Sequence, residues 1–282
     1  MIKNWLIWGL VLLCIGCTTP LEVRPGPIES LLEIKGTISP QSGLEVIVQH
    51  TRSPYEWIPM PLDSAFVVDD AEISIYHQDT LVDVCIYQGN SFYQSRLPHS
   101  IIPGEVYSVK VKAAKYPPAA IENILVPESP PEVRALRLAP FPNRSDNLSL
   151  VKDSLFFDVK NYRGFTVYRI DVRYDSLPLN SYISYIGNLE ETFDPCEGTY
   201  YFTNRCFSDS WISRIYEYSY DRSEDRKTYF HISVIDPKVL DFIQSGYFSG
   251  EDVFVEPPLY QGNVDGGFGY IVGENKIIVP II

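Results

Sequence analysis

The sequence has few basic residues, and this shortage argues against several kinds of partner. Lys and Arg number 23 against 36 Asp and Glu in 282 residues, which gives a formal net charge of −13. A duplex nucleic acid is therefore not an expected partner, because its phosphates must be neutralised by Lys and Arg. Attachment to a membrane surface through basic side chains is disfavoured for the same reason. Low-complexity tracts and repeats of short fixed period are also missing.

Motifs for catalysis and metal binding are equally scarce. The four histidines, His50, His77, His99 and His231, fall in separate segments, and none belongs to the His-Glu-x-x-His pattern of zinc peptidases. No Gly-x-Ser-x-Gly nucleophile elbow is present. Neighbouring acids point to opposite faces of a strand, so adjacency alone does not make a glycosidase pair, although distant acids can still converge. We predict no catalytic residue, no metal and no cofactor.

The N-terminal apolar run, residues 5–15, follows Lys3 and ends at Gly16-Cys17. At about eleven residues it is too short for a helix that crosses roughly 30 Å of hydrocarbon, and its layout is that of a secretory signal. The small residue before the cysteine resembles a bacterial lipoprotein signal, although Cys14 stands where such signals usually have Leu. The resemblance implies a signal peptide over 1–16, lipidation at Cys17 and membrane lipid as a partner. The alternative is an ordinary signal peptide cut nearby, with Cys17 a free thiol.

The chain after Cys17 predicts a tether and then a β-sandwich. Residues 17–30 contain three prolines and a glycine, which block helix and sheet alike. Residues 31–127 show short runs of period two with turn signals about every ten residues, the pattern of an antiparallel sandwich. The Pro103-Gly104-x-x-Tyr107 segment resembles the penultimate strand of immunoglobulin-like and fibronectin-like domains. In those domains the tyrosine hydroxyl holds a neighbouring loop.

The second region, residues 133–282, predicts a β-rich domain with one short helix. Proline-rich segments around residue 127 mark the boundary. The helix is expected near 237–245, because Asp236 can cap it and Pro237 suits its first position. Gly246 then ends it. The fold class is therefore mainly β, with an immunoglobulin-like or fibronectin-like sandwich followed by this β-rich domain.

Two cysteines of this second region, Cys196 and Cys206, predict a disulfide. They lie ten positions apart, and an exported chain enters an oxidising compartment. Such a bridge contributes about 2–3 kcal/mol by the loop-entropy model. A metal site is the alternative, but no histidine or third cysteine lies near them in the sequence.

Aromatic residues supply the candidate binding residues, since they make up 13% of the chain, with 20 Tyr. Exposed rings can stack on sugar faces or anchor a protein partner. The candidates are Trp57, Trp211, Tyr200 and Tyr201. The two tryptophans lie in loop-like stretches, and the two tyrosines lie between the cysteines. The alternating tyrosines of residues 216–220 are more typical of core or edge-strand packing.

A glycine-rich turn near the C-terminus is the most distinctive motif outside the signal. Asn263, Gly266, Gly267 and Gly269 form an Asn-x-x-Gly-Gly-x-Gly pattern. Its spacing is not the dinucleotide fingerprint. It can be read as a cation loop with Asn263 and Asp265 as oxygen ligands. The favoured interpretation is a tight turn at Asp265-Gly266, in which the glycines let backbones pack closely.

Together with the helix and the lipoprotein signal, this turn resembles a family of lipoproteins of Bacteroidota-type bacteria that is defined only as a domain of unknown function. Members are often associated with TonB-dependent outer-membrane receptors. The resemblance implies anchoring in the outer membrane, facing either the periplasm or the cell surface. It also implies a receptor as partner, and it carries no catalytic residue.

Three functional hypotheses follow. The first is a non-enzymatic accessory or binding protein beside a TonB-dependent transporter, with the exposed aromatics as its contacts. The second is a cell-surface glycan-binding protein or glycan hydrolase, which needs aromatic platforms and two acids that face each other across a cleft. The third is a structural protein of the cell envelope without a ligand.

Overall fold

The computed structural model describes residues 30–51, 66–140, 150–174, 196, 201–221, 228–240 and 262–281. The described chain is mainly β, as predicted, and holds no helix of seven or more residues. The predicted signal 1–16, Cys17, the tether up to residue 29, Trp57 and Tyr200 lie outside the described residues. No helix in the described ranges is long and apolar enough to cross a membrane.

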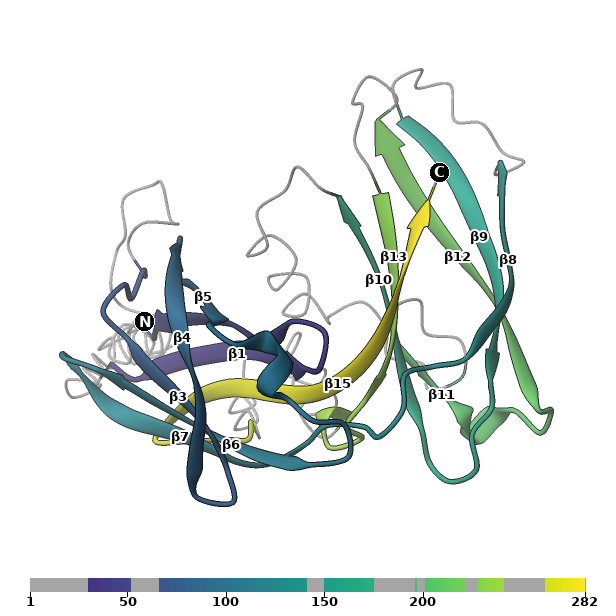
Figure 1. The fold of residues 1–282 in the computed structure, drawn as a ribbon. Coiled ribbons are helices and arrows are strands. Elements are labelled where there is room, and N and C mark those ends of the chain that lie inside the picture. Colours follow the sequence, from purple (N-terminus) through teal and green to yellow (C-terminus); the bar gives the residue numbers. More distant parts are fainter. Residues whose placement is uncertain are drawn as a thin grey trace, which may run out of the picture.

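The first sandwich has two sheet layers, which are parts of one continuous twelve-stranded sheet (Figure 1). One sheet contains the strands β1 (Leu32–Ser39), β2 (Gly43–His50) and β5 (Phe92–Ser95). The other contains the strands β3 (Glu72–His77), β4 (Thr80–Gly89), β6 (Val106–Ala113) and β7 (Tyr116–Leu125). β4 pairs with β3 through its first half and with β5 through its second half, so it joins the two sheets. Alternate residues of these strands form one buried apolar core.

The predicted tyrosine contact is present at the start of β6. The Tyr107 side chain is buried, and its hydroxyl accepts a hydrogen bond of 2.7 Å from the backbone N–H of Ile102. Burial raises the pKa of Tyr107, so the phenol stays neutral. The hydroxyl therefore fixes the turn at Pro103-Gly104 to the core, as it does in immunoglobulin-like domains.

The second sandwich repeats the plan of the first. Its first, second and fifth strands, β8 (Val133–Pro140), β9 (Leu150–Lys160) and β12 (Trp211–Asp221), form the order β12-β9-β8. Its third, fourth and sixth strands, β10 (Val167–Tyr174), β11 (Tyr201–Thr203) and β13 (Thr228–Ile235), pair with the seventh strand in the order β11-β10-β13-β15. A second apolar core lies between these sheets. The predicted β-rich domain is thus a sandwich of the same topology.

The last strand, β15 (Gly267–Ile281), belongs to both sandwiches (Figure 1). Residues 267–273 pair in parallel with β1, and residues 274–281 pair antiparallel with β13. Just before it, β14 (Val264–Asp265) pairs with β7. β7 ends and β8 begins on either side of the predicted division at residues 127–133, but the second domain does not contain all of the predicted range 133–282. Residues 264–273 return to the first sandwich because backbone pairing, which the side-chain pattern does not specify, places them there.

The predicted helix near 237–245 and the predicted glycine turn both lie in the C-terminal region. Asp236 Oδ1 accepts a hydrogen bond from the N–H of Lys238 at 3.1 Å, and residues 239–240 are helical, while 241–245 lie outside the described residues. The chain turns at Gly266, whose φ is +75°, a value that favours glycine. The Asn263 side chain makes two hydrogen bonds to the backbone of Ile271, at 2.7 and 3.0 Å, so its amide is used inside the turn.

Candidate functional site

Trp211 lies in a strand rather than in a loop, which corrects the sequence-based expectation. It is the first residue of β12 and pairs with Lys160 on β9. Its neighbour Ile212 enters the core, so the Trp211 ring points to the outer face of the sheet and is half-buried. The guanidinium of Arg134 lies over this ring, 3.9 Å from its centroid. One face of the tryptophan ring is thus covered by a cation.

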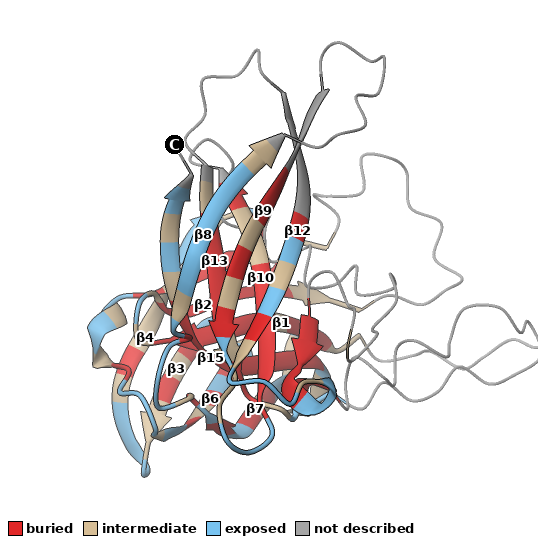
Figure 2. Cartoon of the chain, turned by 90° about the vertical axis from the view of Figure 1, so that its right-hand side faces the viewer, coloured by how far each residue is buried: buried red, intermediate tan, exposed pale blue. Residues whose placement is uncertain are grey.

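A second stack of the same kind lies beside it. Arg137 on β8 is 4.3 Å from the centroid of the Phe156 ring on β9, and Phe156 pairs with Ile215 on β12. The Ile215 side chain is 59% exposed. We call Arg134, Arg137, Phe156, Trp211 and Ile215 the Arg–aromatic face. It lies on the outer side of the β12-β9-β8 sheet, where Figure 2 shows exposed residues mainly along β8 and at single positions of β12.

Hydrogen bonds and ion pairs hold the charged groups of this face in place. Asp158 accepts a hydrogen bond from Ser213 Oγ at 2.7 Å and pairs with Arg134 Nε at 3.2 Å. The hydrogen bond from Ser213, and then Arg134, lower the pKa of the Asp158 carboxyl. Lys160 pairs with Glu132, which raises the pKa of the lysine. Each Arg–aromatic stack contributes about 0.5–1 kcal/mol at an exposed site, so the stacks favour this arrangement of the arginines.

Tyr201 is buried and is not available as an exposed contact, contrary to the prediction. It is 6% exposed and lies on β11, opposite Arg169 of β10. Its ring belongs to an apolar cluster between the two sandwiches, together with Ile47 of β2 and Tyr270 of β15. We call this region the junction. Because Phe202 faces the core, its neighbour Tyr201 lies on the outer side of the sheet that contains β11. The Arg–aromatic face lies on the outer side of the other sheet, β12-β9-β8. The structure therefore does not bring Tyr201 and Trp211 together.

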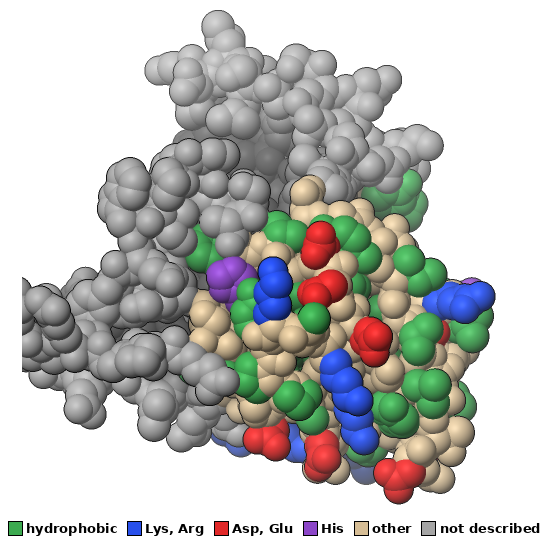
Figure 3. Space-filling view, turned by 90° about the vertical axis from the view of Figure 1, so that its left-hand side faces the viewer, with side chains coloured by type: hydrophobic (Ala, Val, Ile, Leu, Met, Phe, Trp, Pro, Cys, Tyr) green, Lys and Arg blue, Asp and Glu red, His purple; other side chains and the backbone are tan. Residues whose placement is uncertain are grey.

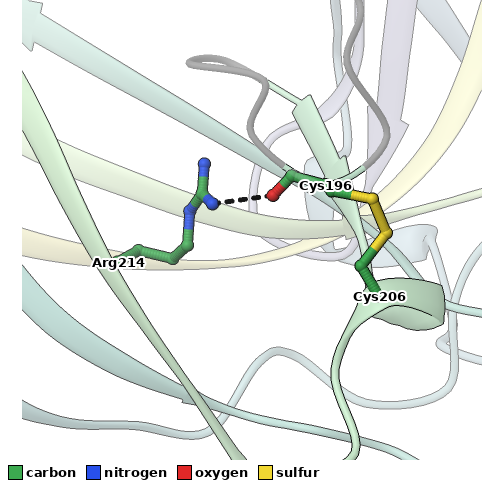
Figure 4. Close-up of a disulfide and its surroundings, with 3 residues drawn as sticks. All are labelled: Cys196, Cys206 and Arg214. Carbon is green, nitrogen blue, oxygen red and sulfur yellow. Dashed lines mark hydrogen bonds between the residues drawn. A yellow bond between two sulfur atoms is a disulfide. The ribbon is translucent and has the colours of Figure 1, made fainter.

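The predicted disulfide between Cys196 and Cys206 is present, with the two Cα atoms 5.5 Å apart (Figure 4). Cys206 ends the short 3₁₀ helix Asn204–Cys206 that follows β11. The carbonyl oxygen of Cys196 accepts a hydrogen bond of 2.9 Å from Arg214 Nη1 on β12. The bridge and this hydrogen bond connect Cys196 to both sheets of the second sandwich. No group of three or more potential metal ligands occurs among the residues that the structure describes.

Six charged side chains form a closed ring at the junction, which sequence reasoning missed. Going around the ring, they are Glu45, Arg173, Asp171, Arg169, Glu274 and Lys276. Each acid contacts two cations and each cation contacts two acids, so the ring is neutral. The side chains are between 1% and 17% exposed. We call this set the charge ring.

The strongest contacts of the charge ring centre on Glu274. Its Oε1 lies 2.8 Å from Lys276 Nζ, and its Oε2 lies 3.3 Å from Arg169 Nη1. Ser233 Oγ donates a further hydrogen bond to Oε2 at 3.3 Å. Burial alone would raise the pKa of Glu274, but Lys276, Arg169 and Arg173 outweigh it and hold this pKa well below its usual range. The carboxyl is therefore ionised and cannot act as a general acid.

Glu45 connects the charge ring to the first sandwich. Its Oε2 lies 3.5 Å from Lys276 Nζ and 3.8 Å from Arg173 Nη1. Glu45 comes from β2, whereas Arg173 comes from β10 of the second sandwich and Lys276 from the shared strand. The ring thus crosses from one sandwich to the other.

His231 lies beside the charge ring and stays neutral. It pairs with Asp171 across β10 and β13, and its Nδ1 is buried without a hydrogen-bond partner among the described residues. Burial, and then the charges of Arg173 and Lys276, lower the pKa of His231 to about 2. A histidine with so low a pKa is no general base at neutral pH. At neutral pH the junction therefore offers neither a proton donor at Glu274 nor a general base at His231.

The sequence did contain a signal for this cluster. Charged residues alternate with apolar ones in Arg169-Ile-Asp171-Val-Arg173, and Glu274 and Lys276 are likewise two positions apart. Such alternation predicts a strand with one face in solvent. The opposite signs at two-residue spacing within one strand were the available clue to a buried ion network.

Comparison with protein-family models gives no match for this chain, and comparison with curated proteins gives none either. The resemblance of residues 263–269 to the Bacteroidota-type lipoproteins therefore stays a prediction.

Replacement of Glu274 by Gln is expected to destabilise the protein by about 3–5 kcal/mol, because it leaves buried cations without their partner. The matched control is Glu33→Gln, which removes a partly exposed pair with Lys35 and should cost about 1 kcal/mol or less. Urea unfolding measures the loss of stability in each of the two variants. Equal losses in the two variants would show that the charge ring contributes no more than a surface pair.

The lowered pKa of His231 predicts that the protein loses stability between pH 7 and pH 5. This pKa is lowered in the folded protein. Below about pH 6.5 the unfolded chain therefore binds a proton at His231 and the folded protein does not. The free energy of unfolding falls as the pH falls, because protonation stabilises the unfolded chain. The expected loss is about 2 kcal/mol at pH 5. Glu274 adds to it only below about pH 4.3, since its own pKa is lowered.

Urea unfolding at the two pH values tests this, with His231→Gln and the exposed His99→Gln as the pair of variants. His231→Gln should make the free energy of unfolding nearly independent of pH between 7 and 5, whatever the variant costs at pH 7. His99→Gln should leave the pH dependence of that free energy unchanged. A pH dependence that survives in His231→Gln would contradict the assignment.

Proposed function

We propose that this chain is a non-enzymatic lipoprotein of the outer membrane, anchored at Cys17, that acts as an accessory or binding component beside a TonB-dependent transporter. The observation that carries the binding role is the Arg–aromatic face. It presents an exposed Ile215 beside the Arg137–Phe156 stack, and the Arg134–Trp211 stack lies on the same face. Preorganised arginines and exposed apolar side chains are typical of protein–protein contacts.

A protein partner suits this face better than a glycan. Sugar stacking needs an open aromatic ring, and Arg134 lies over the ring of Trp211. The most exposed large apolar side chain among the described residues is Ile215, an aliphatic group that packs on apolar groups rather than on hydroxyl groups. The three acids of the junction are each paired with two cations, so they do not supply the acid and base of a hydrolase.

The anchor and the fold act together in this proposal. A lipid at Cys17 confines the protein to the membrane and raises its effective concentration beside a membrane partner. The tether ends where β1 begins, and β1 pairs with the strand that both sandwiches share. The charge ring fixes the two sandwiches relative to each other. The face is therefore presented at a defined angle to the first sandwich.

Cys17→Ala is expected to release the protein from the membrane, because the lipid and not the charge provides attachment in a chain with a net charge of −13. Fractionation of cells into membrane and soluble material measures this. Retention of the variant in the membrane fraction would contradict lipid anchoring at Cys17.

Ile215→Asp is expected to weaken capture of the transporter at least tenfold in a mild-detergent pull-down of the anchored protein, because it places a charge in the centre of the contact. Leu97→Asp is the matched control, since Leu97 is 57% exposed and Ile215 is 59% exposed. Leu97 belongs to the first sandwich, where apolar, acidic and basic side chains are interspersed on the face shown in Figure 3.

Mass spectrometry of the captured material decides the outcome. A stoichiometric β-barrel receptor that is lost with Ile215→Asp and kept with Leu97→Asp supports the proposal. Wild-type protein without any partner, or equal capture by both variants, contradicts it.

A further inference from the structure

The first sandwich is completed by a segment from the far end of the chain. Its first and seventh strands, β1 and β7, are each covered on their outer side by residues of the C-terminal region. β15 pairs with β1 from Leu32↔Gly267 to Ile38↔Gly273, and β14 pairs with β7. Without these residues, the described part of the sandwich would present two open strand edges, which are templates for strand addition.

Close approach of the backbones requires glycine at several positions of this segment. A Cβ atom would meet a backbone carbonyl oxygen of the first sandwich at four positions, namely Gly266, Gly267, Gly269 and Gly273. At Gly267 that atom would lie 2.7 Å from the oxygen of Leu32. At Gly269, where φ is +103°, it would overlap the oxygen of Ile34. Backbone atoms of a paired strand cannot move aside, so only glycine fits at these positions.

Side chains of the same segment add to the fit. Ile271 is 1% exposed and belongs to the core of the first sandwich, and Val264 packs against that core. The Asn263 amide bonds to both backbone groups of Ile271, which holds the turn closed over β1 and β7. The segment therefore inserts through backbone pairing, glycine spacing and two apolar side chains.

We propose that the gap between β1 and β7 is a binding site for an extended polypeptide strand with this glycine spacing. Its occupant in the folded chain is the chain's own segment 262–273. Residues 274–281 remain paired with β13 when this segment leaves, because Thr228↔Ile281 to Ile235↔Glu274 form a separate ladder. Opening the site parts Tyr270 and Val272 from the junction cluster but leaves the β13–β15 ladder of the second sandwich paired. The open site then accepts the same strand of a second copy of this chain by strand addition.

The test uses the full chain with Gly269→Val, which excludes its own segment from the site, and a fluorescent synthetic peptide of residues 262–273. We expect saturable binding of this peptide to the variant, at least tenfold tighter than to the wild-type chain. The control peptide carries the same Gly269→Val replacement and should bind at least tenfold more weakly. Equal binding of the two peptides, or no binding to a variant whose second sandwich is folded, would overturn the proposal.

Native-state hydrogen exchange on the wild-type chain gives a second test that needs no variant. Amides of 267–273, and those amides of β1 that are hydrogen-bonded to β15 rather than to β2, should exchange together and faster than the amides of 274–281, because the segment leaves as a unit. Exchange of 267–273 only in step with 274–281 would show that the site does not open by itself, and this too would overturn the proposal.

Discussion

The parallel ladder between β1 and the first half of β15 is the interaction on which the rest of the structure depends. It joins the two ends of the described chain, and it brings Ile271 into the core of the first sandwich. The same strand continues without a break into the second sandwich, where Ile277 and Val279 pack on the other core. Because Gly273 and Glu274 are adjacent in one strand, no flexible link separates the two bodies at this point.

The charge ring complements this ladder by selecting one angle between the sandwiches. Burial of each ion costs several kcal/mol, so the ring adds little net stability even when every pair is made. The ring instead constrains the geometry, because its members come from β2, from β10 and from the shared strand. All six pairs close only when these three strands take one arrangement. Another angle would leave Glu45 or Arg173 buried without a partner, which is strongly unfavourable.

Much of the local structure could be predicted from the sequence, and the long-range pairing could not. Period-two patterns identified strands such as Glu72–His77, and the Pro-Gly-x-x-Tyr spacing identified the Tyr107 contact. Side-chain patterns do not specify which edge a strand joins, so the return of β15 to β1 was not visible. The charged residues of β10 showed the alternation of a solvated face, yet Arg169 is 5% exposed. The short polar residues before Trp211 are typical of a loop, and they mask the start of β12.

The direction of β1 has a mechanical consequence for the proposed anchor at Cys17. The tether joins β1 at Leu32, and Leu32 pairs with Gly267 at the start of β15. In a parallel pair, a pull on the N-terminal end of one strand and on the C-terminal end of the other loads all the hydrogen bonds of the ladder at once. A partner bound to the Arg–aromatic face would therefore pull against the whole β1–β15 ladder and not against its last bond. The strand that completes the first sandwich is also the one that would transmit force from the membrane to the second.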